Sequence, residues 1–410
     1  MRTYHYKMED ALEAIIDYRG KTPKKAETGI PTLSAKSVKN GYIDYAECYY
    51  ISPEEYERFM VRGTPRVGDI LLTTEAPMGV VARLDRDDVG IAQRLLTLRG
   101  KKGILNNDYL MYYLQSPIGQ HKLSERETGS TVTGIKQAEF RKIEIDIPSY
   151  EEQEKIVSLL IDFDTKINLN KRANTLLYAN IKSLMALWFD EYAPFNGIQP
   201  DDWKEMPLSD LATFIGGYSY KGAELQESTT AMATIKNFDR NGGFKLDGYK
   251  EIVPSDKLKS TQHVEIFDTL VAHTDLTQGA EVIGNAELVL SKSGYEDIVF
   301  SMDVVKVLPK DNKITKFVLG ALLSGPKFKG HCLGYVNGTT VLHLSKKALP
   351  EYRLIYPTNP SVLEPLNSCL ENLYRLIASN IEGNIRLQAL KDTFLPKLLS
   401  GEIDVSEVEF

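Results

Sequence analysis

The sequence predicts an α+β protein in which two strand-rich globular domains are joined by two long helices, and in which the second half is a divergent copy of the first. Three observations support this prediction. A segment without glycine or proline shows heptad spacing, a second segment repeats that spacing 210 residues later, and matching strand-like segments precede both. With 410 residues, the chain is long enough for several domains that each have a core.

The first helical segment extends from Glu151 to Trp188. Its apolar residues recur in alternating steps of four and three, which is typical of a coiled-coil helix rather than a surface helix of a globular domain. Two asparagines occupy positions where the pattern expects apolar residues. The predicted seam residues, meaning those that face the partner helix, are Ile156, Leu160, Phe163, Ile167, Asn170, Asn174, Leu177 and Ile181.

The second helical segment repeats this pattern, including both asparagines. Lys391 stands where the pattern expects an apolar residue, and Pro396 is expected to kink or end the helix. Two such helices in one chain should pack on each other, and the domain between them favours an antiparallel pair. The asparagines would then fix register at a cost in stability, unless they face solvent on an imperfect helix. The equivalent seam residues are Leu366, Leu370, Leu373, Ile377, Asn380, Asn384 and Leu387.

The segments before the helices also match. Alternating apolar residues, typical of a half-buried strand, end at Pro148 and at Pro357. Each proline follows a glycine by 19 residues, and each glycine opens a Gly-Ser/Thr-Thr turn (residues 129–131 and 338–340). Weaker matches, expected to be strands followed by turns, pair residues 68–74 with 267–274 and residues 30–33 with 232–235. The predicted domains are 1–148 (the first head), 149–195 (helical), 196–358 (the second head) and 359–410 (helical).

Charge and composition set limits on function. The net charge of −7 disfavours nucleic-acid binding by the whole surface. Residues 1–149, however, carry 22 Lys and Arg against 21 Asp and Glu, and residues 19–25 hold four cations, so a local basic surface is possible. The sequence shows no run of apolar residues long enough for a membrane span and no signal-peptide pattern. Its three cysteines are far apart, which suits the reducing cytoplasm.

Several motifs together resemble the specificity subunit of a type I restriction–modification system. They are residues 68–74 (Gly-Asp-Ile-Leu-Leu-Thr-Thr), 129–131 (Gly-Ser-Thr), 145–148 (Ile-Asp-Ile-Pro) leading to 152–156 (Glu-Gln-Glu-Lys-Ile), and 395–403 (Leu-Pro-Lys-Leu-Leu-Ser-Gly-Glu-Ile). Each motif is short, but their order and duplication extend the resemblance over nearly the whole chain. The second copy lacks the Glu-Gln pair, so its helix is expected to start differently.

The resemblance implies two target-recognition domains that read a bipartite site on double-stranded DNA, one half per domain. It also implies that two modification subunits dock on the helices and that restriction subunits, the translocase and nuclease, join them. S-adenosylmethionine, ATP and Mg would be bound by those partners, and this chain would hold no cofactor, no metal and no catalytic residue.

The sequence agrees with a non-catalytic reading. It has no Asn/Asp-Pro-Pro-aromatic motif of an amino-methyltransferase, no phosphate-binding P-loop, and no metal-ligand spacing among its six histidines. Residues 214–217 do not fit a cofactor-binding glycine turn, and the adjacent Asp201 and Asp202 fit a linker better than a nuclease site. His273, beside Thr274 and Asp275, fits a polar loop better than a catalytic base.

The residue types that contact phosphates and base edges predict the DNA contacts of each head. In the first head they are Lys21, Lys24, Lys25, Lys36, Lys39, Thr73, Thr74, Arg94, Ser130, Thr131 and Lys136. In the second head they are Tyr218, Tyr220, Lys221, Lys236, Asn237, Arg240, His273, Thr274, Gln278, Asn337, Thr339 and Thr340.

Two alternatives remain open on the sequence. The chain could be a helical-pair scaffold for other proteins with no role on DNA, which its net negative charge favours. It could also serve a methyltransferase that has no restriction partner. Neither the DNA sequence recognised nor the spacer between its halves can be inferred from the chain.

Overall fold

The computed structural model describes residues 2–129, 133–277 and 279–405. The chain forms two compact units. Unit 1 comprises residues 1–165 and 387–410, and unit 2 comprises residues 166–386, so each unit contains one head and part of each long helix. Within the described residues, no helix is both long and apolar enough to cross a membrane.

The described residues of unit 1 form mostly antiparallel sheets and five short α-helices. Its main sheet has the order β2 (Leu12–Asp17), β10 (Leu95–Gly100), β7 (Ile70–Thr73), β8 (Val81–Arg83). The other sheets are β6 (Tyr49–Ile51), β3 (Ile30–Leu33), β9 (Gly90–Ile91); β1 (Thr3–Lys7), β11 (Glu144–Pro148); and β4 (Val38–Lys39), β5 (Tyr42–Ile43). The short helices are α1 (Met8–Ala11), α2 (Pro53–Phe59), α3 (Asn107–Gln115), α4 (Pro117–Ser124) and α5 (Gln137–Arg141).

Unit 2 repeats this topology. Its main sheet has the order β13 (Ala212–Gly216), β20 (Val304–Pro309), β16 (Thr269–Ala272), β18 (Ala286–Leu288). The other sheets are β15 (Lys250–Glu251), β14 (Thr230–Ala233), β19 (Asp297–Phe300); β12 (Trp203–Pro207), β23 (Arg353–Pro357); and β17 (Thr274–Asp275), β22 (Leu342–Leu344), β21 (Val336–Asn337). The short helices are α7 (Lys316–Leu323), α8 (Pro326–Leu333) and α9 (Ala348–Glu351). In both units a three-stranded sheet contains one parallel pair, β3 with β9 and β14 with β19.

The main sheet of each unit is buried on both faces, which explains its continuous apolar sequence. Successive side chains of a strand point to opposite faces. In β7, Ile70 and Leu72 join the core that contains Ile156 of the long helix, whereas Leu71 joins a second core beneath β3. Strand β16 divides its residues between two cores in the same way. The predicted α+β class and the internal repeat are therefore confirmed.

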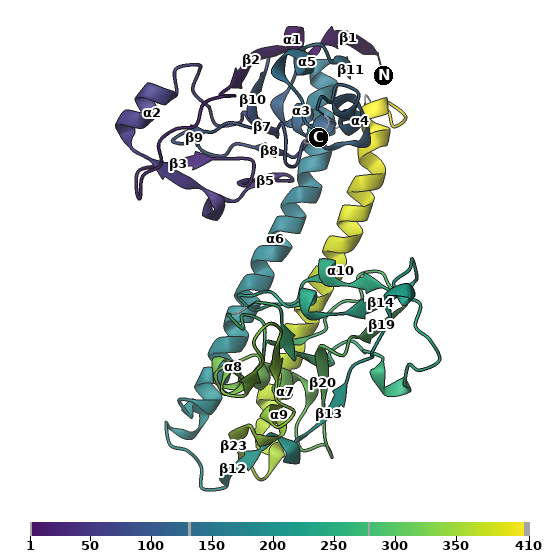
Figure 1. Cartoon of the computed structure of the whole chain (residues 1–410). Helices are drawn as coiled ribbons and strands as arrows, with labels where there is room; N and C mark the ends of the chain where they lie inside the picture. Colours follow the sequence, from purple (N-terminus) through teal and green to yellow (C-terminus); the bar gives the residue numbers. More distant parts are fainter. Residues whose placement is uncertain (1, 130–132, 278, 406–410) are drawn as a thin grey trace. The chain divides into compact units, whose positions relative to one another are not determined.

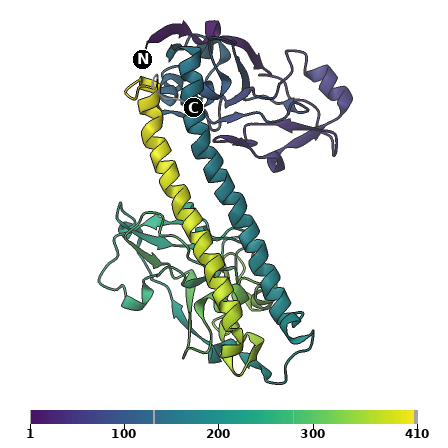
Figure 2. The same cartoon turned by 180° about the vertical axis from the view of Figure 1, so that it is seen from behind.

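The long helices are α6 (Tyr150–Phe189) and α10 (Glu364–Ser400). Within unit 2 they lie side by side in both views, α6 in teal and α10 in yellow-green (Figures 1 and 2). The amide of Asn170 donates to Asn384 at 2.8 Å, and that of Asn380 donates to Asn174 at 2.8 Å. Because positions rise in α6 as they fall in α10, the pair is antiparallel, as predicted.

These two hydrogen bonds do not join asparagines that are equivalent in the repeat. The repeat equates Asn170 with Asn380 and Asn174 with Asn384, yet each asparagine bonds the counterpart of the other. A two-fold relation between two helices produces this pattern, since residue i then contacts j and j contacts i. The asparagines therefore face the partner helix, not solvent.

The two helices start differently. Helix α6 begins two residues after Pro148, with a capping box in which Glu152 accepts from the Ser149 backbone N–H (3.0 Å) and Ser149 Oγ accepts from the Glu152 N–H (3.3 Å). Helix α10 begins only after a 3₁₀ turn, η8 (Pro360–Leu363). The different start expected from the missing Glu-Gln pair is confirmed.

The sequence predicts that Pro396 kinks or ends the second helix, and of these two outcomes the ending is wrong. Helix α10 continues through Pro396 to Ser400. Proline removes one backbone donor from the helix interior. The last turns are nevertheless held by packing, because Leu395, Leu398 and Leu399 are buried in the core of unit 1.

Candidate nucleic-acid interface

Each head presents a lysine on a rigid turn after its parallel strand. In the first head, Ser37 Oγ accepts from the Ser34 backbone N–H at 3.2 Å. In the second, Asn237 Oδ1 accepts from the Thr234 N–H at 2.8 Å and its amide donates to the Lys245 carbonyl. The residue before the bonded side chain, Lys36 or Lys236, is exposed in both turns. Asn237 itself is fully buried, so it shapes the turn rather than contacting DNA, which corrects its prediction.

The basic loop at residues 19–25 is exposed, as a phosphate-binding loop requires. Lys21, Lys24 and Lys25 all reach solvent, and Lys25 Nζ lies 4.8 Å from the centre of the Tyr49 ring. Arg94, also exposed, binds Glu75 at 2.8 Å and has a backbone φ of 73°. The four predicted cations remain candidates for phosphate contacts.

Four more predicted contacts are buried, which contradicts a direct role at the surface. Thr73 is fully buried, and its hydroxyl accepts from the Val80 backbone N–H at 2.9 Å. Tyr218 is 2% exposed and donates to Glu224 at 2.6 Å. Loop position alone does not reveal burial, because burial depends on which segments cover the loop. The four are Thr73, Thr74, Tyr218 and Thr274.

The other predicted contacts fall into three groups. Those with exposed side chains are Lys136, Lys221, Arg240, Asn337, Thr339 and Thr340. Those that are half-buried are Lys39, Tyr220 and His273. Those outside the described residues are Ser130, Thr131 and Gln278. All of these, like the exposed lysines above, stay predictions.

A cavity of about 460 Å³ in the second head lies beside two of the predicted cations, Lys236 and Arg240. Its lining also contains Asp239, Asp247 and Glu281. Arg240 Nε lies 3.1 Å from Glu281, so this cation is already paired. The mixed charge of the lining gives the cavity no clear preference for an anion.

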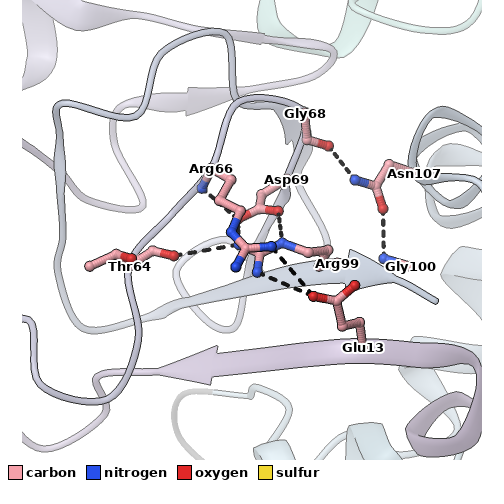
Figure 3. A network of polar contacts seen from close by, with 8 residues as sticks. All are labelled: Glu13, Thr64, Arg66, Gly68, Asp69, Arg99, Gly100 and Asn107. Carbon is pink, nitrogen blue, oxygen red and sulfur yellow. Dashed lines mark hydrogen bonds and ion pairs between the residues drawn. The ribbon is translucent and has the colours of Figure 1, made fainter. Parts of the chain in front are cut away.

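The motif at residues 68–74 has a structural role (Figure 3). Asp69 is 1% exposed and accepts two hydrogen bonds from Arg99, each 2.7 Å long. The Asp69 carboxylate raises the pKa of Arg99. Asn107 donates to the Gly68 carbonyl at 2.7 Å and accepts from the Gly100 N–H at 2.6 Å. Arg99, which lies on β10, therefore holds the loop before β7 and is not available to a phosphate.

The Glu-Gln pair of the other motif also has a structural role. Gln153 is fully buried at the start of α6. Its carbonyl accepts from the Asn106 N–H at 2.8 Å and its amide donates to the Ile104 carbonyl at 2.8 Å. In unit 2, Thr315 caps α7 as Asn106 caps α3 in unit 1. The side chain of Asn367 on α10 contacts Thr315, as Gln153 on α6 contacts Asn106.

The predicted seam residues are all buried or half-buried. Lys391 stands where the seam pattern expects an apolar residue, and polar partners in unit 1 accommodate it. Its Nζ lies 2.6 Å from Asp164 and 4.8 Å from the centre of the Tyr112 ring, and Tyr112 also donates to Asp164 at 2.7 Å. A lysine can occupy this seam position because α6 and α3 supply its partners.

The Gly-Thr-Thr turn of the second head, residues 338–340, lies between β21 and β22 of the three-stranded sheet β17–β22–β21. The first head has its counterpart as isolated bridges, Glu75 with Gly134 and Thr128 with Gly134. The candidate contacts predicted from the sequence omit His343, which lies on β22 of this sheet, and Lys346, which follows that strand by two residues; both are exposed. The sequence signal for His343 is the alternation of residues 342–344, where this one polar residue separates two leucines.

Among the described residues, no cluster of three or more His, Cys, Asp or Glu side chains could hold a metal ion.

Comparison with known proteins identifies similar chains. Residues 8–178 match the family model described as the type I restriction modification DNA specificity domain. The type I restriction enzyme MjaIX specificity subunit of Methanocaldococcus jannaschii is 23% identical, with 92% of this chain and 88% of the relative aligned. The HindI specificity subunit of Haemophilus influenzae is 20% identical over 78% of this chain and 82% of the relative.

A solved structure, the S subunit of a type I restriction–modification system from M. genitalium, has a similar fold. The TM-score is 0.55 at 16% sequence identity, and the match covers 97% of this chain and 96% of that one. At this identity the likeness establishes the fold, and it extends over both units and both long helices.

Proposed function

Because the chain is related to the specificity subunits of type I restriction–modification systems, we propose that it reads a bipartite DNA site and recruits the subunits that modify and cut DNA. The observation that supports this most is the repeated topology of the heads. Both have the same strand order, and both place a lysine on the same turn, but their exposed polar side chains differ. One frame with two reading surfaces suits two different half-sites.

Partner binding is supported by an apolar stripe on α6 within unit 2. Leu169, Leu176 and Leu187 are 55%, 67% and 39% exposed. Their separations of 7 and 11 residues are close to whole turns of a helix, so they lie along one face. We propose that two modification subunits dock on the helices and that restriction subunits join this complex.

The chemistry would then reside in the partners. S-adenosylmethionine would serve the modification subunits, and ATP and Mg the restriction subunits. This chain would be non-catalytic and would act in the cytoplasm, where the host DNA is.

The test is a head exchange in the full chain, expressed with its modification subunits. Residues 1–148 are replaced by those of a relative with another specificity, and methylated sites in the host DNA are mapped by sequencing. One half of the methylated site should change while the other half stays the same. The matched exchange of residues 196–358 should change only the other half.

Two outcomes would contradict the proposal. If either exchange altered both halves, the heads would not read separately. If removing the gene left the methylation pattern unchanged, the chain would not determine specificity. A scaffold without a DNA role would also show little salt dependence when the assembled complex binds DNA, whereas phosphate contacts make affinity fall steeply with salt.

A further inference from the structure

The sheet β17–β22–β21 of the second head presents the side chains of His343 and Asn337 to solvent. His343 lies on the middle strand, opposite Thr274 on one side and Asn337 on the other. Its neighbours Leu342 and Leu344 are 8% and 2% exposed, so the strand is anchored on one face while His343 is exposed on the other. The histidine is therefore held on a rigid element rather than on a loop.

The side chain of His273 lies near both His343 and Lys346. Burial lowers the pKa of His273, and the nearby His343 and Lys346 lower it further, while Asp303 opposes them. His273 is also fixed by its backbone, since its N–H donates to the Asp303 carbonyl and its carbonyl accepts from Leu344. A neutral imidazole offers one donor and one acceptor.

The carboxylates near this group are already engaged. Asp303 accepts from the Thr274 hydroxyl at 3.0 Å. Asp275 is 3% exposed and accepts from the backbone N–H groups of Thr277 and Val282. The exposed groups beside these carboxylates are therefore the hydrogen-bonding side chains of His343 and Asn337 and the cation of Lys346, residue types that contact DNA.

The first head has the same backbone frame without these side chains. Gly134 stands at the position of His343, between Glu75 and Thr128. A Cβ at Gly134 would lie 2.5 Å from the Thr74 carbonyl oxygen, so this position cannot carry a side chain without a shift. The two heads thus differ in their side chains at this row of a shared frame.

We propose that His343, supported by His273 and Asn337, contacts a purine edge in the major groove of the half-site read by the second head, and that Lys346 contacts an adjacent phosphate. Purines present the N7 acceptor there, asparagine can bond both N6 and N7 of adenine, and a lysine that contacts only phosphate carries no sequence information. This inference rests on the proposed function and assigns part of the specificity to named residues.

The test uses the full chain with its modification subunits. His343→Ala should relax the methylated site at one or two positions of one half, with methylation at the non-cognate bases rising about tenfold. Asn337→Ala should relax the same half. Lys346→Ala should instead weaken DNA binding at every sequence and reduce its salt dependence, with no change in the preferred site.

Two controls separate the possible failures. His121→Ala removes an exposed histidine of the first head that pairs with Glu125 and should leave the site unchanged. His343→Gln keeps hydrogen-bonding capacity and should alter the base preference rather than remove it.

If both His343 variants assemble and keep the original site, while exchange of residues 196–358 changes that half, this inference is wrong and the proposed function stands. If the exchange changes neither half, the proposed function fails. If His343→Ala fails to assemble while His343→Gln assembles with the original site, His343 is structural and the inference is also wrong.

Discussion

The two heads meet the same structural demand with different residues. In each, an aspartate precedes the central strand, follows a residue with positive φ (Gly68 at 91° and Phe267 at 72°), and is buried. In the first head Arg99 binds Asp69 through two bonds of 2.7 Å, and in the second Lys306 lies 3.4 Å from Asp268. The shared frame thus requires a buried aspartate with a cation, but not a particular cation.

The largest expected effect tests this difference. Arg99→Leu leaves Asp69 buried and unpaired, which should destabilise the first head by about 4 kcal/mol, since removing one partner of a buried ion pair typically costs about 3–5 kcal/mol. Lys306→Leu should cost about 2 kcal/mol in the second head, because the one contact of Lys306 with Asp268 is longer than the two bonds of Arg99 with Asp69. Hydrogen exchange measured by mass spectrometry, peptide by peptide, reports each head separately.

The control for this pair is Arg66→Leu. Arg66 reaches Glu13 at 3.5 Å, but both side chains are more than half exposed, so exchange should hardly change. Equal losses for Arg99→Leu and Lys306→Leu would show that the number and length of the bonds do not decide the stability of the frame.

The long helices and the repeat could be predicted from sequence because periodicity is a local signal. The spacing of Ile156, Leu160 and their counterparts gave the helix pair, and the asparagine positions gave its register. The polar contacts could not be predicted, because they depend on which distant segment covers a residue. The Thr73 hydroxyl is bound by the backbone N–H of Val80. The strand that holds His343 pairs with Thr274, nearly 70 positions away in the sequence.

The helix pair also differs between the units. In unit 1, Asp164 and Lys391 face each other as an ion pair. Their repeat counterparts in unit 2 are Tyr374 and Ile181, both buried in an apolar core. At these equivalent positions unit 1 therefore has a polar cluster and unit 2 has apolar packing.

The second prediction follows from that contrast. Lys391→Leu should destabilise unit 1 by about 3 kcal/mol, since it leaves the Asp164 carboxylate beside an apolar group. Adding Asp164→Leu and Tyr112→Phe, which removes the other polar partners, should restore most of the loss. Hydrogen exchange in the α6 and α10 peptides of unit 1 measures both changes. If the triple variant were no more stable than the single one, the polar cluster would contribute more than the pairing of one charge.

The heads differ again in how they hold the Asn-Gly turn that follows the exposed lysine. In the first head the Gly41 N–H donates to the Val81 backbone carbonyl at 2.8 Å. In the second, the Gly243 N–H donates to the Glu287 carboxylate at 2.6 Å. Burial raises the pKa of Glu287 to about 7, while the Gly243 N–H and Lys182 oppose this shift. Only the second turn therefore depends on a group that titrates near neutral pH.

The smallest expected effect tests this dependence. Because the folded pKa of Glu287 is above its ordinary value of 4.5, ionisation favours the unfolded state. Its contribution to stability is fully present below pH 4.5 and is lost as the pH rises through about 7. Glu287→Gln cannot ionise, but its carbonyl still accepts from Gly243. The variant should therefore be more stable than the parent at pH 8 by about 2 kcal/mol, less than the full shift implies because the side chain is only half-buried, and equal to it near pH 4.

Urea unfolding followed by tryptophan fluorescence measures this difference in the second unit alone, because both tryptophans, Trp188 and Trp203, belong to it. Glu281→Gln, which removes an exposed carboxylate of the same head, should show no such trend with pH. A stability difference between Glu287→Gln and the parent that stayed constant from pH 5 to pH 8 would mean that the carboxylate is ionised throughout. The turn would then be as insensitive to pH as the backbone bond that holds its counterpart in the first head.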